Sequence, residues 1–163
     1  MREFLFRGQT RRYGQYVNMA GEKQPGRWVY GGIFPGTGDF SIIYGADKEE
    51  FTGADLGKHP VYTETVGQYT GLKDKNGKRI FEGDIISFND GLDYFKGEVV
   101  FENGAFGIGS DAVIGSPYSC CDNFVLLWQL LWEQDATDEP ELYYCTVIGT
   151  IHDNPELLEV RHE

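Results

Sequence analysis

The sequence lacks any long apolar run. No stretch approaches the roughly 18 consecutive apolar residues that a membrane-spanning helix needs. The first residues, MREFLFRGQTRR, have too short an apolar part for a secretory signal, and no small-residue cleavage site follows. Cysteine is scarce as well: Cys120 and Cys121 are adjacent and Cys145 stands alone, which is typical of free thiols in a reducing compartment. We therefore expect a cytoplasmic protein with no membrane contact.

Catalytic and cofactor motifs are also missing. The chain has no G-x-S-x-G nucleophile, no Walker A loop and no cysteine in a protease context. His59, His152 and His162 are far apart, none has metal-ligand spacing, and His59 stands before a proline in an expected loop. The glycines of residues 104–109 lack the G-x-G-x-x-G spacing and suit a bent strand better. We therefore expect no cofactor, no metal and no catalytic residue.

Positive charge is scarce and unevenly placed in a chain of net charge −12. Residues 1–30 hold six Arg or Lys against two Glu, giving +4, whereas residues 89–163 hold two against fifteen acidic residues, giving −13. The acidic part would repel a phosphate backbone, so non-specific DNA binding is not expected. The charge split suggests a homo-oligomer in which the basic end of one subunit faces the acidic end of another. Interspersed solubilising charge is the alternative explanation.

Aromatic residues and glycine are abundant, with 11 Phe, 10 Tyr, 3 Trp and 22 Gly, and they favour strands and tight turns. Short strand-like stretches separated by Gly-containing turns predict an all-β, mainly antiparallel protein. We expect an N-terminal β-unit over residues 1–64 and a small barrel over residues 65–163, which can also form one compact unit. Residues 46–60 are expected to be a surface connection. The predicted core comprises Phe4, Trp28, Ile42, Val66, Ile85, Val99, Phe106, Val147 and Ile151.

Local signals predict particular turns and helical segments. Asn76-Gly77 predicts a type I′ hairpin turn in which both residues have φ > 0. The apolar stretch DNFVLLWQLLWEQ predicts one short helix or helical turn near residues 126–133, with a strand over FVLLW and a following turn as the competing interpretation. Asn154 followed by Pro155 predicts a terminal helical turn, because Asn caps helices and Pro suits the first helical position.

The one local excess of positive charge lies around the predicted Asn76-Gly77 hairpin. Lys73, Lys75, Lys78 and Arg79 surround its tip, and Tyr69 lies nearby in the sequence. Basic and aromatic side chains together can contact a nucleic-acid backbone or a partner protein. These five residues are therefore weak candidates for an interaction surface. Lysines at hairpin tips also serve solubility and edge protection, which is the alternative.

Carboxylates are numerous, and one pair stands out. Glu82 and Asp84 flank Gly83 and could share a proton or hold a divalent ion. A tight turn over Glu82–Asp84 explains the same residues without chemistry, because an Asp side chain can bond nearby backbone amides.

The stretch TVGQYTGLKDKNGKRIFEGDIISF, residues 65–88, resembles the hallmark segment of the YopX family of bacteriophage and prophage proteins. EFLFRG and RWVYGG are similar to that family's N-terminal strands, and VIGTIHDNPELLE is similar to its C-terminal signature. The resemblance implies an all-β protein whose C-terminal part is an SH3-type β-barrel, a prophage origin and a bacterial cytoplasm. It supplies no activity and no catalytic residues.

Two functional hypotheses follow. The first is a prophage-encoded, non-enzymatic binding or assembly module, oligomeric, with a phage or host protein as its partner. The alternative is a metal-assisted hydrolase acting on a phosphorylated or nucleotide substrate, and it depends on the acidic half of the chain and on the Glu82/Asp84 pair.

Overall fold

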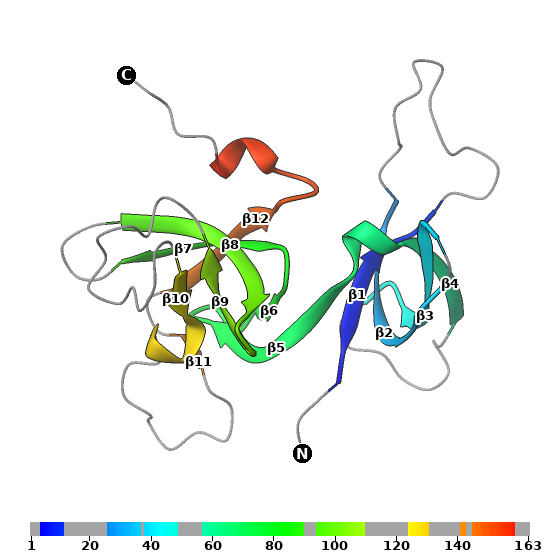
Figure 1. Ribbon diagram of the computed structural model, residues 1–163, viewed down its shortest axis with the longest axis horizontal. Helices are drawn as coiled ribbons and strands as arrows, with labels where there is room; N and C mark the ends of the chain where they lie inside the picture. Colours follow the sequence, from blue (N-terminus) through cyan, green and yellow to red (C-terminus); the bar gives the residue numbers. More distant parts are fainter. Residues whose placement is uncertain are drawn as a thin grey trace. The chain divides into compact units, whose positions relative to one another are not determined.

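The computed structural model describes residues 4–11, 26–36, 38–48, 57–89, 94–109, 124–130, 141–142 and 145–158. The described chain is mostly antiparallel β-structure, which confirms the predicted all-β class, and its helical segments are short 3-10 turns (Figure 1). It divides into two compact units, Met1–Tyr69 and Thr70–Glu163. This division lies inside strand β5, whereas the sequence analysis placed it between residues 64 and 65. No helix in the described part is long and apolar enough to cross a membrane.

The N-terminal unit is an antiparallel sheet in the order β5-β1-β2-β3-β4. Its elements are β1 (Phe6–Gln9), β2 (Trp28–Phe34), β3 (Phe40–Ala46), β4 (Gly57–Tyr62), the 3-10 turn η2 (Thr63–Thr65) and the first residues of β5 (Gly67–Asp74). Strands β2 and β3 pair with each other in antiparallel order.

Strand β4 corrects the expected loop over residues 46–60. His59 and Pro60 lie in β4, and the ring Nε2 of His59 is 3.1 Å from the carbonyl oxygen of Gly45. The Pro60 carbonyl accepts a 3.0 Å hydrogen bond from the Arg11 N–H rather than from β3. Because N and C=O of one strand residue point to the same side, the Pro60 nitrogen also faces away from β3. Proline therefore removes no hydrogen bond from the β3–β4 ladder.

The sheet of the N-terminal unit curls back on itself. A bridge pairs Thr10 with Val61, so the end of β1 lies beside β4. Strands β2 and β3 approach closely at the pair Gly31 and Gly45, where a methyl group built on Gly45 would lie 1.7 Å from the Tyr30 carbonyl oxygen. Only glycine allows this approach of two backbones, so the close contact depends on these two residues.

The buried face of this sheet is opposite to the predicted one. Of the expected core residues, Phe4 is 71% exposed, and Trp28 and Ile42 are only partly buried. Their chain neighbours Leu5, Val29 and Ile43 are buried instead. Val29 and Ile43 form the core with Val61, and the predicted Val66 packs against it, partly buried. Successive side chains in a strand point to opposite faces of the sheet. An error of one residue in the predicted alternation therefore exchanges the buried side chains of a strand for the exposed ones.

The C-terminal unit contains a five-stranded antiparallel sheet in the order β10-β9-β8-β7-β12. Its strands are β7 (Asp84–Asn89), β8 (Tyr94–Glu102), β9 (Ala105–Gly109), β10 (Phe124–Leu126) and β12 (Cys145–Thr150). The end of β5 pairs with β6 (Arg79–Phe81), and β11 (Glu141–Leu142) adds to β5 in parallel. The core cluster comprises Ile80, Ile86, Phe88, Val99, Ile108, Val125, Leu127, Cys145 and Val147. Among the predicted core residues, Ile85 is also buried, whereas Phe106 and Ile151 are partly buried.

The helical turn expected near residues 126–133 is confirmed in the part that the structure describes, as the 3-10 turn η4 (Leu127–Leu130). Residues 124–126 before it form strand β10. Val125 pairs with Ile108 of β9, and both are fully buried. Pairing with a neighbouring strand thus outweighs the local helical pattern over residues 124–126, where the competing strand interpretation holds. Residues 131–133 and the pair Cys120 and Cys121 lie outside the described residues. The predicted terminal helical turn is confirmed as η5 (Pro155–Leu158), in which the Leu157 N–H donates to the Asn154 carbonyl at 3.1 Å.

The type I′ turn predicted at Asn76-Gly77 is wrong. Gly77 has φ of 76°, but Asn76 does not have a positive φ. The Gly77 N–H instead bonds the Asp74 carbonyl at 2.9 Å, so a turn through Lys75 and Asn76 is followed by one left-handed glycine. Both φ angles are positive at the second Asn-Gly pair, Asn103 (51°) and Gly104 (82°), which joins β8 to β9.

Candidate functional site

The β5–β6 hairpin carries four of the five residues predicted as interaction candidates. Lys75 and Lys78 are exposed at its tip, and Lys73 and Arg79 are partly buried at its base. Tyr69 is only 6% exposed. Its ring therefore cannot serve as a contact surface, which corrects that part of the prediction. The hairpin presents two exposed lysines rather than a basic and aromatic patch.

A buried carboxylate that the sequence analysis left unassigned holds this hairpin. The side chain of Asp74 is 1% exposed. Its Oδ1 accepts hydrogen bonds from the backbone N–H groups of Asn76 (2.8 Å) and Lys78 (3.0 Å). Its Oδ2 accepts one from the Val147 N–H of β12 (3.0 Å). One carboxylate thus fixes the shape of the turn and attaches it to the edge strand of the five-stranded sheet.

A backbone contact strengthens the same attachment. The Lys75 N–H donates to the Cys145 carbonyl at 3.1 Å, next to the bond from Val147 to Asp74. The hairpin therefore covers backbone groups on the side of β12 that does not face β7. An uncovered strand edge is a template for pairing with other chains, so this contact also protects the sheet.

The Cys145 thiol lies fully buried beside this contact. Burial, and secondarily the charge of Asp74, raise the pKa of Cys145 to about 12. The thiol is therefore protonated at physiological pH, and a protonated buried thiol is a poor nucleophile. Cys145 serves as a small apolar core residue.

One of the two carboxylates in the Glu82–Asp84 turn, that of Asp84, has a structural role. Asp84 is fully buried, and its Oδ2 accepts a 2.8 Å hydrogen bond from the Phe81 N–H. Gly83 has φ of 79° and donates its N–H to the Val99 carbonyl at 2.8 Å. Among the residues that the structure describes, no group of three His, Cys, Asp or Glu side chains is placed to hold a metal. The hydrolase hypothesis gains no support from this pair.

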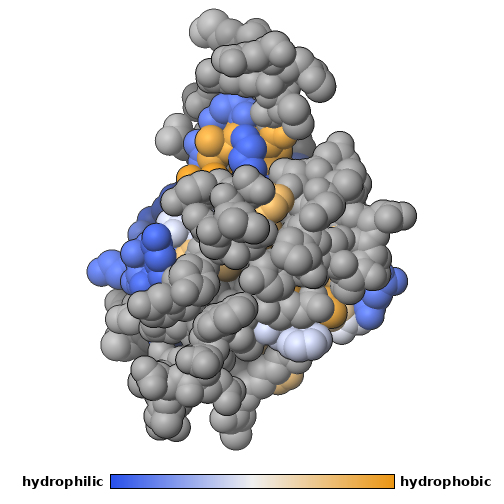
Figure 2. Space-filling view, turned by 90° about the vertical axis from the view of Figure 1, so that its left-hand side faces the viewer, coloured by the Kyte–Doolittle hydropathy of each residue, from blue (hydrophilic) through white to orange (hydrophobic). Residues whose placement is uncertain are grey.

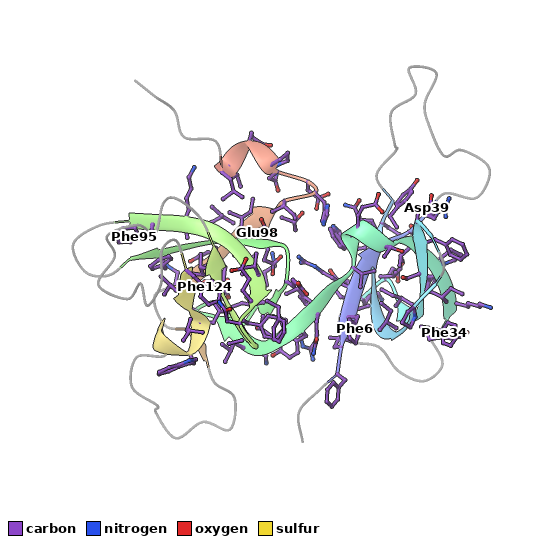
Figure 3. The ribbon with its side chains drawn as sticks, viewed as in Figure 1. Phe6, Phe34, Asp39, Phe95, Glu98 and Phe124 are labelled. Carbon is purple, nitrogen blue, oxygen red and sulfur yellow. The ribbon has the colours of Figure 1, made fainter. Side chains whose placement is uncertain are left out.

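Glu82 does interact with a carboxylate from another strand. Glu98 lies on β8, is labelled in Figure 3, and is partly buried. Burial, and secondarily the charge of Glu82, raise the pKa of Glu98 above its ordinary value of 4.5. Figure 2 looks onto the C-terminal unit, and the described residues that it colours mix hydrophilic with hydrophobic side chains.

Replacing Glu98 by Gln is expected to raise the free energy of unfolding at pH 7. The folded-state pKa of Glu98 is raised, so its contribution to stability is present below the unfolded pKa and is lost as pH rises through the folded pKa. Urea unfolding at pH 7 and at pH 4 measures this, and the gain from Glu98→Gln should disappear at pH 4. Glu102→Gln, at an exposed position of the same strand, is the control. An equal gain at both pH values would contradict the explanation.

A second surface, which the sequence analysis missed, lies on the outer face of β2, β3 and β4. Phe34 is 62% exposed and Tyr44 is 48% exposed; Figure 3 shows Phe34 on the outside of the N-terminal unit. Such side chains usually lie in the core, and exposed apolar patches commonly mark interaction sites. We define the outer patch by the six residues that the register places on this face: Gly32, Phe34, Ile42, Tyr44, Lys58 and Pro60.

Two stacked cations lie elsewhere in the same unit. The Arg7 guanidinium lies 4.7 Å from the centre of the Trp28 ring. Arg11 lies 5.4 Å from the rings of both Phe40 and Tyr62. Cation–π contacts of this kind hold basic side chains against aromatic rings in the unit.

The fold defines an all-β protein built from two sheet-forming units. A family model described as YopX protein matches residues 36–159. The chain therefore belongs to the YopX family, which confirms the resemblance seen in residues 65–88. Among solved structures, the chain is similar to the crystal structure of protein EF1440 from Enterococcus faecalis, with 21% sequence identity and a TM-score of 0.45. That match covers 98% of this chain and 100% of the other. No curated protein matches the chain.

Proposed function

We propose that this YopX-family protein is a non-enzymatic binding module that contacts an acidic partner protein through the tip of the β5–β6 hairpin. The observation that carries the proposal is the Asp74 carboxylate, which holds a hairpin bearing the exposed Lys75 and Lys78 in one shape. A binding loop that is ordered before the partner arrives loses less conformational entropy on binding.

The wider setting belongs to the same proposal. The partner is a phage or host protein, and the gene is carried by a prophage in the cytoplasm of a bacterial host. The module works as a homo-oligomer, supported by the charge difference between its two ends. Residues 65–163 act as an SH3-type barrel that presents its loops to partners. The small antiparallel sheet β10-β9-β8-β7-β12 and the short β5–β6 and β8–β9 hairpins support this part.

The test starts from a tagged protein used to capture partners from a nuclease-treated lysate of induced host cells, followed by affinity measurement with each purified partner. The double variant Lys75→Glu/Lys78→Glu is expected to weaken the affinity at least about tenfold, because each change replaces an attraction by a repulsion. Its melting temperature should stay close to that of the original protein, since both side chains are exposed.

The matched control is Arg27→Glu/Lys48→Glu, which makes the same charge change at two exposed basic residues of the N-terminal unit outside the outer patch. This control should retain the partner. Equal affinities of the hairpin variant and the original protein for every partner would refute the assignment of this surface.

A further inference from the structure

The outer patch of the N-terminal unit suggests a function that does not depend on the hairpin. Besides the two exposed rings, Ile42 and Pro60 are partly exposed and Lys58 is exposed. The opposite faces of the same strands carry the buried core residues Val29, Ile43 and Val61. The patch is therefore the outward face of a well-packed sheet, and its side chains are presented by regular strands rather than by loops.

The register sets the spacing of the two strand positions that carry the rings. Phe34 pairs with Ile42, and Tyr44 pairs with Gly32, so Phe34 and Tyr44 are diagonal neighbours on adjacent strands. Diagonal positions in an antiparallel pair are about 7–8 Å apart. That is about twice the 3.4 Å separation of stacked bases along a strand. The two positions are therefore close enough for both rings to contact one planar group.

The position of Gly32, which lies next to both rings, is open. A methyl group built on Gly32 would have no atom within 4 Å. By contrast, methyl groups on the neighbouring Gly31 and Gly45 would collide with backbone atoms at 2.0 Å and 1.7 Å. A glycine is thus required at those two positions by the backbone, but not at Gly32. The absence of a side chain at Gly32 lets a planar group approach the sheet directly.

The charge of the patch indicates what kind of planar group it takes. Lys58 pairs directly with Tyr44, and none of the six patch residues is acidic. The N-terminal unit, moreover, does not carry the negative net charge of the chain. Residues 1–69 hold eight Arg or Lys and eight Asp or Glu, for a net charge of zero, whereas residues 70–163 hold six and eighteen, for −12. The patch therefore lies on the neutral unit and can accept a negatively charged chain.

We propose that the outer patch binds single-stranded nucleic acid, with a base stacked on Phe34 and Tyr44 over Gly32 and a phosphate beside Lys58. Exposed aromatic rings on a sheet with an adjacent cation are what sequence-tolerant single-strand binding requires, since every base has a flat face. A duplex keeps its bases stacked inside, so it cannot use the rings. A peptide would satisfy the rings, but the cation and the absence of carboxylates favour an anionic chain.

The test is fluorescence anisotropy with a labelled single-stranded oligothymidylate, and with a duplex of the same length, at low salt. Binding of the single strand should exceed binding of the duplex. Phe34→Ala and Tyr44→Ala should each weaken single-strand binding by about 5- to 150-fold, which is the range expected for loss of one stacked base. The slope of log K against log salt concentration is negative, and Lys58→Ala should make it less steep by about 0.7. This is the value for one phosphate contact on a single strand.

Gly32→Val fills the open position and should also abolish stacking, while its melting temperature should be unchanged because the added atoms meet open space. Phe101→Ala, which removes an exposed ring from the C-terminal unit, is the matched control and should bind normally. Melting curves of every variant show that each is folded, so loss of binding can be assigned to the patch.

Three results would overturn the proposal: no binding of the single strand, equal binding of single strand and duplex, or normal binding by all four patch variants. Sedimentation of the same variants distinguishes the other occupants of this surface. If Phe34→Ala and Tyr44→Ala change the oligomeric state and the oligonucleotide does not bind, the patch is a contact between copies of the chain. Binding of a proline-rich peptide in place of the oligonucleotide would equally reject nucleic acid.

Discussion

Asp74→Ala is expected to destabilise the C-terminal unit by about 3–5 kcal/mol. The change removes one acceptor group from the backbone N–H groups of Asn76, Lys78 and Val147. The bond to Val147 is buried, and an unsatisfied buried donor costs about 1–3 kcal/mol. The other two bonds are partly exposed, so water can replace the carboxylate there at a cost of about 1 kcal/mol each.

Urea unfolding of the purified variants measures this loss. Asp74→Asn is a sharper comparison, because it keeps one oxygen and places an amide NH₂ against a backbone donor, so it should lie between the original protein and Asp74→Ala. Asp153→Ala is the control; its carboxylate is exposed and accepts a hydrogen bond from the Thr150 hydroxyl at 3.1 Å. A loss of less than about 1 kcal/mol for Asp74→Ala would show that the carboxylate does not hold the hairpin.

Val147→Asp is expected to be at least as severe, with a loss of about 3–5 kcal/mol, typical of an uncompensated buried charge. Val147 is 8% exposed and belongs to the core cluster of the C-terminal unit. Its own backbone N–H already binds the Asp74 carboxylate, so the new carboxylate would lie in the core near a charge of the same sign. The free energy of unfolding of a typical domain is only about 5–15 kcal/mol, so such a loss would leave little folded protein.

The adjacent residue provides the control for this change. Ile148 is 40% exposed, so Ile148→Asp adds the same charge one position along the strand, where water solvates it. Its effect should stay below about 1 kcal/mol. Thermal unfolding followed by near-ultraviolet circular dichroism compares the two variants. Similar melting temperatures for both would contradict the assignment of the buried face of β12.

The resemblance of residues 65–88 led to the correct family from the sequence alone, and the all-β class followed from short strands between glycines. Both conclusions depend on patterns among residues that are neighbours in the sequence, and such patterns can be recognised without the structure. The terminal turn at Asn154-Pro155 belongs to the same group, because its controlling contacts lie within a few residues of one another.

Errors arose where distant residues decide the outcome. Trp28 and Ile42 have as apolar a character as Val29 and Ile43, and only the curling of the sheet determines which set is enclosed. The stretch after Asp122 has a helical pattern, but pairing with β9 makes residues 124–126 a strand, and the helical turn begins only at Leu127. Strand pairing depends on the partner and not on the segment itself.

The candidate surfaces show the same difference between features set by neighbouring residues and features set by distant ones. The sequence located the basic hairpin, because its lysines are consecutive neighbours around a recognisable turn. It could not show that Tyr69 is buried, or that Asp74 faces inward and binds Val147, a residue 73 positions away. The outer patch was likewise hidden, because Phe34, Tyr44 and Lys58 come from three strands.

The sequence by itself determined the family, the predominance of antiparallel strands and the position of the basic hairpin. Each of these depends on residues that are close together in the sequence. Only the tertiary structure decided which face of each strand is buried, which carboxylate is structural and which aromatic rings stay exposed. Burial is a property of the packed sheet, and one residue of register exchanges a strand's inner and outer side chains.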